Sequence, residues 1–128
     1  MELTYAEICV SGPVRPNNED RAGFWQPEAP EDRRDFGSIA LLADGVGGRN
    51  RGEVASALAI QCALDIFCTS DPATDPRKVL RQVFDFASRS IYDESLKNPQ
   101  EGQMCTTLTA CVFRHNEVTI GYAGDTRA

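Results

Sequence analysis

The chain has 128 residues, enough for one domain that buries roughly two-thirds of the surface its unfolded chain would expose. Nineteen acidic against thirteen basic residues give a formal net charge of −6, which argues against a nucleic-acid-binding surface. No apolar run approaches the length of a membrane span, and the start Met1-Glu2-Leu3 lacks the features of a signal peptide. We therefore expect a cytoplasmic protein with no nucleic-acid or membrane partner.

The cysteine pattern carries no metal or disulfide signature. The five cysteines are odd in number and show no C-x-x-C spacing. Both a disulfide framework and a zinc site are disfavoured by this spacing, which predicts buried, reduced thiols. The residues are Cys9, Cys62, Cys68, Cys105 and Cys111.

The first third of the chain predicts two strands separated by a loop. Near-alternation of apolar and polar residues predicts a strand from Leu3 to Val10. Prolines and asparagines between Val14 and Asp20 then forbid a regular element. A short apolar and aromatic strand follows from Arg21 to Trp25, and residues 27–36 are expected to form an exposed loop without obvious chemistry.

The loop before the second strand displays one guanidinium and two carboxylates, from Arg15, Glu19 and Asp20. A guanidinium fork suits two phosphate oxygens, and adjacent carboxylates suit a cation that the same phosphate would approach. The alternative is a solvated connection in which the three charges are incidental.

The segment from Leu41 to Ser56 organises the rest of the chain. Ser38 to Ala43 predicts a central strand buried on both faces, and Asp44 follows it directly. Glycines such as Gly45 let backbone come close to a bound ion or phosphate, and a hard cation prefers oxygen ligands. The competing interpretation is a tight strand-to-helix turn with Asp44 solvated.

Two helices are predicted in the middle of the chain. Apolar positions wrap much of the circumference between Glu53 and Phe67, which is typical of a packed helix. After a polar break, Asp75-Pro76 supplies an N-cap and a proline at the first helical position. The amphipathic helix that begins there is stopped by Pro99 and Gly102.

The chain returns to strands at its end. Thr106 to Arg114 and Val118 to Ala123 predict a hairpin. Its turn holds His115, the only histidine, which we expect to be solvated rather than catalytic. Gly124-Asp125-Thr126 then repeats the pattern of an aspartate beside a glycine at a strand end.

Three separated stretches occur in an order that resembles the N-terminal half of the metal-dependent PP2C-type (PPM) serine/threonine protein phosphatases, bacterial type. They are Val14-Arg15-x-x-x-Glu19-Asp20, then Ala43 to Gly48 continuing to Gly52-Glu53-x-Ala55-Ser56, then Thr106-Thr107-Leu108 with Gly121 to Ala128. The resemblance implies that residues 1–128 are the N-terminal portion of a single phosphatase domain. It also implies an α+β fold, a four-layer α-β-β-α sandwich of two antiparallel sheets flanked by helices, present here only in part.

The resemblance further implies hydrolysis of phosphoserine and phosphothreonine in proteins by a water that two Mg²⁺ or Mn²⁺ ions activate. Asp44 would bridge the two ions, while Glu19 and the carbonyl of Gly45 would bind one of them. Asp20 would support the site from outside the ligand set, and Asp125 would match the residue that helps to hold a third, looser ion.

The resemblance assigns the substrate phosphate to Arg15. Val46 stands where many eukaryotic members carry a histidine thought to act as general acid, whereas bacterial members often have an apolar residue there. The general acid of the family is therefore missing at this position, and leaving-group protonation falls to water or to another group.

The family's later Asp-Gly and Asp-Asn motifs have no counterpart before Ala128. We therefore expect weak metal affinity and poor catalysis from this chain alone. Unpaired sheet edges would need the remaining half of the domain, a partner or a second copy to cover them.

Two rival interpretations stay open. A truncated or degenerate phosphatase fold could serve as a non-catalytic binding or regulatory module. Cys9 and Arg15 also fit the C-x5-R spacing of cysteine-dependent phosphatases, which require the loop to run straight into a helix that lowers the thiol pKa. Here Pro16-Asn17-Asn18 follows the arginine instead.

Overall fold

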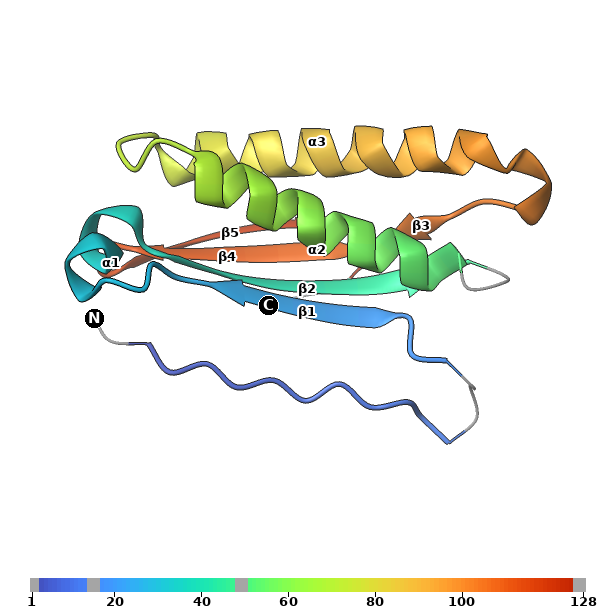
Figure 1. The fold of residues 1–128 in the computed structure, drawn as a ribbon, viewed down its shortest axis with the longest axis horizontal. Coiled ribbons are helices and arrows are strands. Elements are labelled where there is room, and N and C mark those ends of the chain that lie inside the picture. Colours follow the sequence, from blue (N-terminus) through green and yellow to red (C-terminus); the bar gives the residue numbers. More distant parts are fainter. Residues whose placement is uncertain (1–2, 14–16, 48–50, 126–128) are drawn as a thin grey trace.

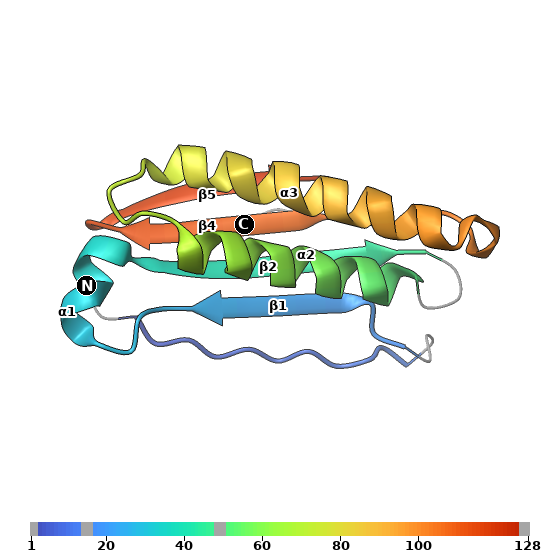
Figure 2. The ribbon, with the colours of Figure 1, turned by 45° about the horizontal axis from the view of Figure 1, so that its top comes forward.

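The computed structural model describes residues 3–13, 17–47 and 51–125 of the chain. In chain order the elements are β1 (Asp20–Trp25), α1 (Pro30–Phe36), β2 (Ser38–Val46), α2 (Arg51–Thr69), α3 (Pro76–Lys97), the 3₁₀ helix η1 (Pro99–Glu101), β3 (Cys105–Thr106), β4 (Leu108–Arg114) and β5 (Glu117–Ala123). Figures 1 and 2 show α2 and α3 on the same face of one sheet.

The sheet is antiparallel throughout, in the order β1-β2-β4-β5, and β3 pairs with the end of β2. The register places Asp20 opposite Asp44 and Gly45 opposite Thr106. The described residues therefore form an α+β fold with one sheet, and they do not include the second sheet of the expected sandwich.

The core lies between the sheet and the two long helices. Alternation along β2 turns Ile39, Leu41 and Ala43 towards the helices, where all three are buried. The end of α2 adds Phe67, which packs edge-on against Trp25 and Phe36 with ring centroids 5.8 and 5.7 Å away. These contacts anchor α2 across the sheet.

Helix α2 departs from one expectation. An 18-residue window within its 19 residues has a mean hydropathy of 1.3, so by length and composition alone it passes as a membrane span, contrary to the prediction that no such run exists. In this fold α2 packs on β1 and β2 beside α3, which packs on β4 and β5, and the buried residues of α2 include Ala59, Ala63 and Phe67. Its apolar character is accounted for by packing.

The opposite face of the sheet is open and apolar among the described residues. Side chains on this face include Leu42 at 44% exposure, Ile120 at 52% and Tyr122 at 57%. The prediction that the strand from Ser38 to Ala43 is buried on both faces is therefore wrong for this part of the chain, because the helices cover only one face.

The strand predicted from Leu3 to Val10 is also not formed. Residues 3–13 run extended along the side of the sheet away from the helices, as both ribbon views show, without joining a ladder. Tyr5 stacks on Phe24 of β1 with ring centroids 4.4 Å apart. The alternating sequence gives an extended backbone, but no neighbouring strand pairs with it.

Helix α1 replaces part of the loop predicted over residues 27–36. Pro30 occupies its first turn. Acidic residues in the first turn and basic residues in the last turn interact favourably with the helix dipole and stabilise the helix. Gly37 ends the helix with φ of 80°, and its N–H donates to the carbonyl of Arg33. These were the sequence signals for the helix.

The remaining elements confirm the predictions to within a few residues. Both long helices and the hairpin of β4 and β5 form, although Thr107 divides the predicted strand Thr106 to Arg114 into β3 and β4. All five cysteines are free, as expected, but Cys9 and Cys105 are exposed rather than buried.

We expect Asp75→Ala to lower the melting temperature, because the Asp75 carboxylate caps α3 by accepting from the N–H of Arg77 (2.9 Å). Hydrogen bonds from Arg77 lower the pKa of Asp75 from 3.8 to about 2. Because the pKa of Asp75 is lower in the folded chain than in the unfolded chain, its carboxylate stabilises the fold at pH values above about 4. This contribution is lost as the pH falls from about 4 towards 2. Across this pH range the melting temperatures of the native chain and of Asp75→Ala should approach each other. The control Asp85→Ala, at an exposed position of α3, should have the melting temperature of the native chain at every pH.

Candidate metal centre

Two of the sequence-predicted acidic segments meet at the end of β2. The N–H of Gly45 donates to the carbonyl of Glu19 at 3.2 Å, and Asp20 lies opposite Asp44 in the β1–β2 register. The strand pairing thus brings residues 24 to 26 positions apart in sequence to neighbouring places, and Asp44 lies within β2 rather than just beyond it.

Two glycines, Gly45 and Gly52, allow the end of β2, the start of α2 and Glu19 to pack closely together. A Cβ at Gly45 would lie 2.0 Å from the carbonyl oxygen of Gly52 and 2.8 Å from that of Glu19. A Cβ at Gly52 would lie 2.8 Å from the carboxyl carbon of Glu19. The end of β2, the start of α2 and the Glu19 carboxyl group are therefore in direct contact, which only residues without a side chain permit.

A third segment fixes Asp44 from the other side. The N–H of Asp44 donates to Thr107 Oγ1 (3.0 Å), and its carbonyl accepts from the Thr107 N–H (2.9 Å) and from Thr106 Oγ1 (3.0 Å). A Cβ at Gly124 would lie 2.7 Å from Thr107 Cγ2, so the segment that carries Asp125 also passes this end of the sheet.

Ion pairs hold the first turn of α2 against its surroundings. Arg21 of β1 contacts Glu53 with Nη2 and Oε1 2.5 Å apart. Arg51, which is 5% exposed, donates to Glu101 Oε2 (3.1 Å) and to the carbonyl of Ser95 (3.4 Å). The helix that supplies Gly52 is thereby tied both to β1 and to the end of α3.

The donor set at this end of the sheet is hard and anionic. Carboxylates of Glu19 and Asp44 and the carbonyl of Gly45 are the oxygen ligands that Mg²⁺ and Mn²⁺ prefer. Within residues 3–13, 17–47 and 51–125, no group of three or more His, Cys, Asp or Glu side chains is arranged to hold a metal. Glu19, Asp44 and Gly45, called the cradle below, therefore supply the types of oxygen group that part of a metal site needs.

The structure describes every predicted site residue except Arg15. Glu19, Asp20, Asp44 and Gly45 are neighbours in the backbone, and Asp125 follows a residue packed on Thr107. Arg15 lies outside the described residues. Val46, 57% exposed, extends β2 beyond the cradle and pairs with Cys105.

The hydrogen bonds of Thr106 and Thr107 were not foreseen as part of the site. These residues entered the sequence argument only through the family resemblance, and a Thr-Thr pair before an apolar strand is common enough to carry no chemistry by itself. His115 lies in the β4–β5 turn at the opposite end of the sheet, as expected for a residue without a catalytic role.

The structural context required of a cysteine-dependent phosphatase is absent. Cys9 is exposed in the extended segment, where its sulfur lies 2.9 Å from Asn18 Nδ2. Residues 17–19 are not helical and lead into β1. In the described part of this region no helix begins directly after the C-x5-R segment, as that mechanism requires.

Comparisons with known proteins find bacterial serine/threonine phosphatases similar in sequence and in structure. No protein-family model matches the chain. The serine/threonine protein phosphatase PstP of Mycobacterium tuberculosis is 34% identical over 127 residues, which cover 98% of this chain and 22% of PstP. The serine/threonine phosphatase stp of Listeria monocytogenes is 27% identical over 119 residues, covering 91% of this chain and 45% of that protein.

Solved structures give the same result. The crystal structure of PstP from M. tuberculosis superposes with a TM-score of 0.74 and 31% identity, over 92% of this chain and 45% of that one. The PstP catalytic domain in complex with two manganese ions also gives a TM-score of 0.74, at 30% identity, over 92% of this chain and 46% of that one. The chain spans half or less of the length of these curated relatives. It is homologous to part of the bacterial PP2C-type serine/threonine phosphatases, covering 45% of stp and 22% of PstP in sequence and about half of the solved PstP chains.

Proposed function

We propose that this chain is the N-terminal part of a metal-dependent domain that hydrolyses phosphoserine and phosphothreonine in proteins. One observation carries the proposal: hydrogen bonds and close packing link Glu19 to Gly45, Asp44 to Thr107, and Thr107 to Gly124. Three separated acidic or glycine-rich segments thus share one end of the sheet. The two manganese ions bound by the PstP catalytic domain support Mn²⁺ or Mg²⁺ as the cofactor here.

Each residue of the cradle has a role in this proposal. Asp44 would be shared by two ions, the Glu19 carboxylate and the Gly45 carbonyl would bind one of them, and Asp20 would support the ligands from outside. Bound there, such ions would lower the pKa of a water to near neutral and so provide the nucleophile for phosphate-ester hydrolysis. Arg15 holds the substrate phosphate, since a guanidinium pairs with two phosphate oxygens.

Asp125 has the remaining role, that of helping to hold a third and looser ion. Val46 has no ionisable group, so it cannot protonate the leaving group. In this proposal water or another group delivers that proton.

The open face of the sheet supports the rest of the expected sandwich. Exposed apolar side chains from β2 and β5 gather on it: Leu42, Val46, Val118, Ile120 and Tyr122. A continuous apolar face of this kind needs a covering layer. We propose that the remaining half of the domain, as a second sheet with its own helices, covers this face, or that a second copy of the chain does so.

The five free cysteines suit a reducing compartment, which supports the proposed cytoplasmic location. No nucleic-acid or membrane partner belongs to the proposal. Its substrate is a phosphorylated protein.

A non-catalytic binding module is the second candidate. It is favoured by the small donor set, because two carboxylates and a carbonyl hold one ion weakly and leave a second ion short of ligands. On either account, this chain alone should be a poor catalyst.

Mn²⁺ mapping by NMR tests the proposal. Mn²⁺ is paramagnetic and broadens amide signals near its site, so we expect titration to broaden residues 19–20, 44–47 and 52 first. Slow hydrolysis of p-nitrophenyl phosphate should depend on Mn²⁺ and disappear in EDTA. Cys9→Ser, which removes the only thiol of the C-x5-R segment, should leave that hydrolysis unchanged.

Other outcomes contradict the proposal in distinct ways. Broadening centred on other carboxylates would remove the metal centre from the end of β2. No broadening at millimolar Mn²⁺ would favour the binding module. Hydrolysis that survives EDTA and is lost in Cys9→Ser would restore the thiol mechanism.

A further inference from the structure

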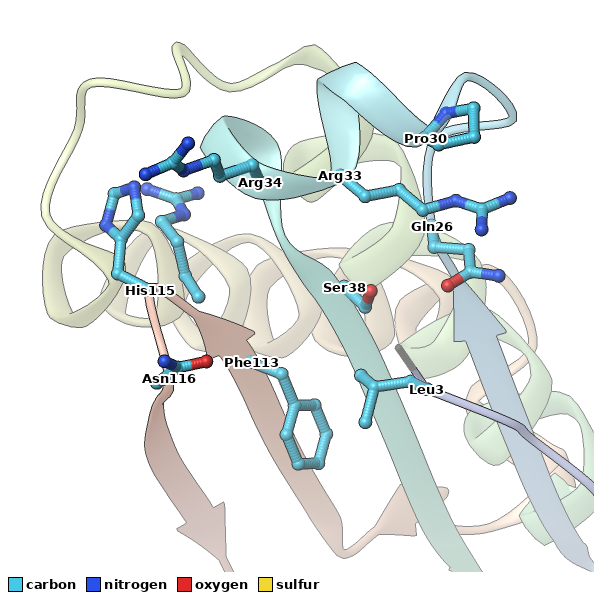
Figure 3. A pocket seen from close by; sticks show the side chains of 10 residues that line it. Leu3, Gln26, Pro30, Arg33, Arg34, Ser38, Phe113, His115 and Asn116 are labelled. Carbon is cyan, nitrogen blue, oxygen red and sulfur yellow. The ribbon is translucent and has the colours of Figure 1, made fainter. Parts of the chain in front are cut away.

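A pocket of about 680 Å³ opens at the end of the sheet opposite to the metal cradle. Its walls come from the extended N-terminal segment, α1, the start of β2 and the β4–β5 turn (Figure 3). The lining residues are Leu3, Gln26, Pro30, Arg33, Arg34, Ser38, Phe113, Arg114, His115 and Asn116. Ser38 lies six residues before Asp44 along β2, which separates the two sites by roughly 20 Å at the usual rise of a strand.

The pocket is strongly basic within an acidic chain. Three arginines and the only histidine line it, and no carboxylate is among the described residues that do so. The whole chain carries a formal charge of −6. A concave site whose charged side chains are all arginines, in a protein of net negative charge, concentrates anions.

Arg114 has donor capacity that the fold does not use. Its side chain is 6% exposed, and its Nε donates to the carbonyl of Phe36 (2.9 Å). Its Nη1 donates to the carbonyls of Pro72 and Thr74, both at 2.8 Å. Its buried Nη2 has no hydrogen-bond partner in the part of the chain that the structure describes. A buried guanidinium nitrogen left unpaired is costly, so this atom indicates a missing acceptor.

Two further basic side chains line the same pocket. Arg34, in the last turn of α1, makes no ion pair or hydrogen bond within residues 3–13, 17–47 and 51–125, whereas neighbouring Arg33 donates to the carbonyls of Pro27 and Glu28. His115 sits in the tight turn between β4 and β5 with φ of 52°. In Figure 3 the Arg34 guanidinium and the His115 imidazole lie at the same side of the pocket.

We propose that this pocket binds a phosphoryl group, held by Arg34, Arg114 and His115. Guanidinium forks pair with two oxygens of one phosphate, and an imidazole N–H adds a further donor. Opposite the basic side, Leu3 and Phe113 provide an apolar wall, which suits a phosphomonoester with an apolar or aromatic group better than free phosphate. The site is separate from the proposed phosphatase centre and does not depend on it.

NMR titration with phenyl phosphate and, separately, with inorganic phosphate tests this assignment. The titrations use EDTA to remove divalent ions and constant ionic strength set with sodium chloride. We expect the largest amide shifts at residues 34 and 114–116. Tighter binding of phenyl phosphate would identify a phosphomonoester site, and equal binding would identify a site for free phosphate; either result supports the phosphoryl assignment.

Matched variants separate the site from general charge. Arg34→Gln should weaken binding at least about tenfold, as the loss of a charge-assisted hydrogen-bond pair predicts. Arg89→Gln removes the same charge from an exposed position of α3 and should change affinity less than twofold. His115→Asn should weaken binding severalfold, and asparagine tolerates the positive φ of the turn. Arg114 is left unchanged because three of its hydrogen bonds hold the fold.

Three results would overturn the assignment. The first is the absence of a saturable change in the amide signals of residues 34 and 114–116 during either titration. Another is an equal loss of affinity in Arg34→Gln and Arg89→Gln. The third is a set of shifts confined to residues 19–20 and 44–47, which would place the phosphate at the proposed catalytic end and leave the basic pocket empty.

Discussion

Replacing Asp44 with asparagine should weaken Mn²⁺ binding to this chain by at least about 100-fold, since even an outer partner of a metal ligand is typically worth 10- to 100-fold. The substitution keeps the shape of the side chain and removes its charge. The backbone hydrogen bonds of Asp44 to Thr106 and Thr107 do not involve the carboxylate and should survive. The effect should therefore appear in metal affinity, measured by calorimetry, with an unchanged far-ultraviolet circular dichroism spectrum.

Two controls make this prediction specific. Asp20→Asn, directly opposite in the β1–β2 register, should cost about tenfold, because Asp20 is expected to act on the ligands rather than on the ion. Asp93→Asn, on an exposed position of α3, should cost nothing. If Asp44→Asn and Asp93→Asn bind Mn²⁺ equally well, the end of β2 holds no metal, and the proposed phosphatase centre fails with it.

Much of the cradle was predictable because its residues carry local signals. In the sequence, Asp44 and Gly45 come directly after the apolar run of β2, and Glu19 and Asp20 come directly before the apolar run of β1. The family resemblance supplied their order. Antiparallel pairing of β1 with β2 then makes the two segments neighbours, a result that a sequence pattern anticipates only if it also predicts which strands pair.

Other parts depended on packing that sequence patterns do not encode. Leu3 to Val10 has the alternation of a strand, yet strand formation requires a partner with free backbone groups, and none pairs with it. Conversely, residues 30–36 were predicted as a loop because they are mostly charged and lack an apolar face. Their helix signals are only the proline at the start of α1 and the glycine after its end. Propensity was outweighed by tertiary context in the first case and by helix-end signals in the second.

The basic pocket shows a further limit of sequence reasoning. Arg34 and His115 are 81 positions apart, and neither belongs to a recognisable motif. They meet because α1 and the β4–β5 turn lie at the same end of the sheet. Only the folded chain shows that Arg114, which lines the same pocket, has an unused donor.

Replacing Gly45 with alanine should destabilise the fold by about 3 kcal/mol or more, at the upper end of the cost of overpacking. The added Cβ would lie 2.0 Å from the carbonyl oxygen and 2.5 Å from the carbonyl carbon of Gly52, and 2.8 Å from the carbonyl oxygen of Glu19. All three atoms are backbone. Relief therefore requires β1, β2 or α2 to move, whereas a flexible side chain could have turned aside.

Urea unfolding measures this cost, with Gly12→Ala as the matched control because nothing lies within 4 Å of a Cβ there. The control should change the free energy of unfolding by less than about 1 kcal/mol, in the range of glycine-to-alanine changes at unstrained sites. Equal stabilities of the two variants would mean that the end of β2 and the start of α2 are not in contact. Glu19 would then have no fixed position beside Gly45, and the cradle would not exist as a preformed site.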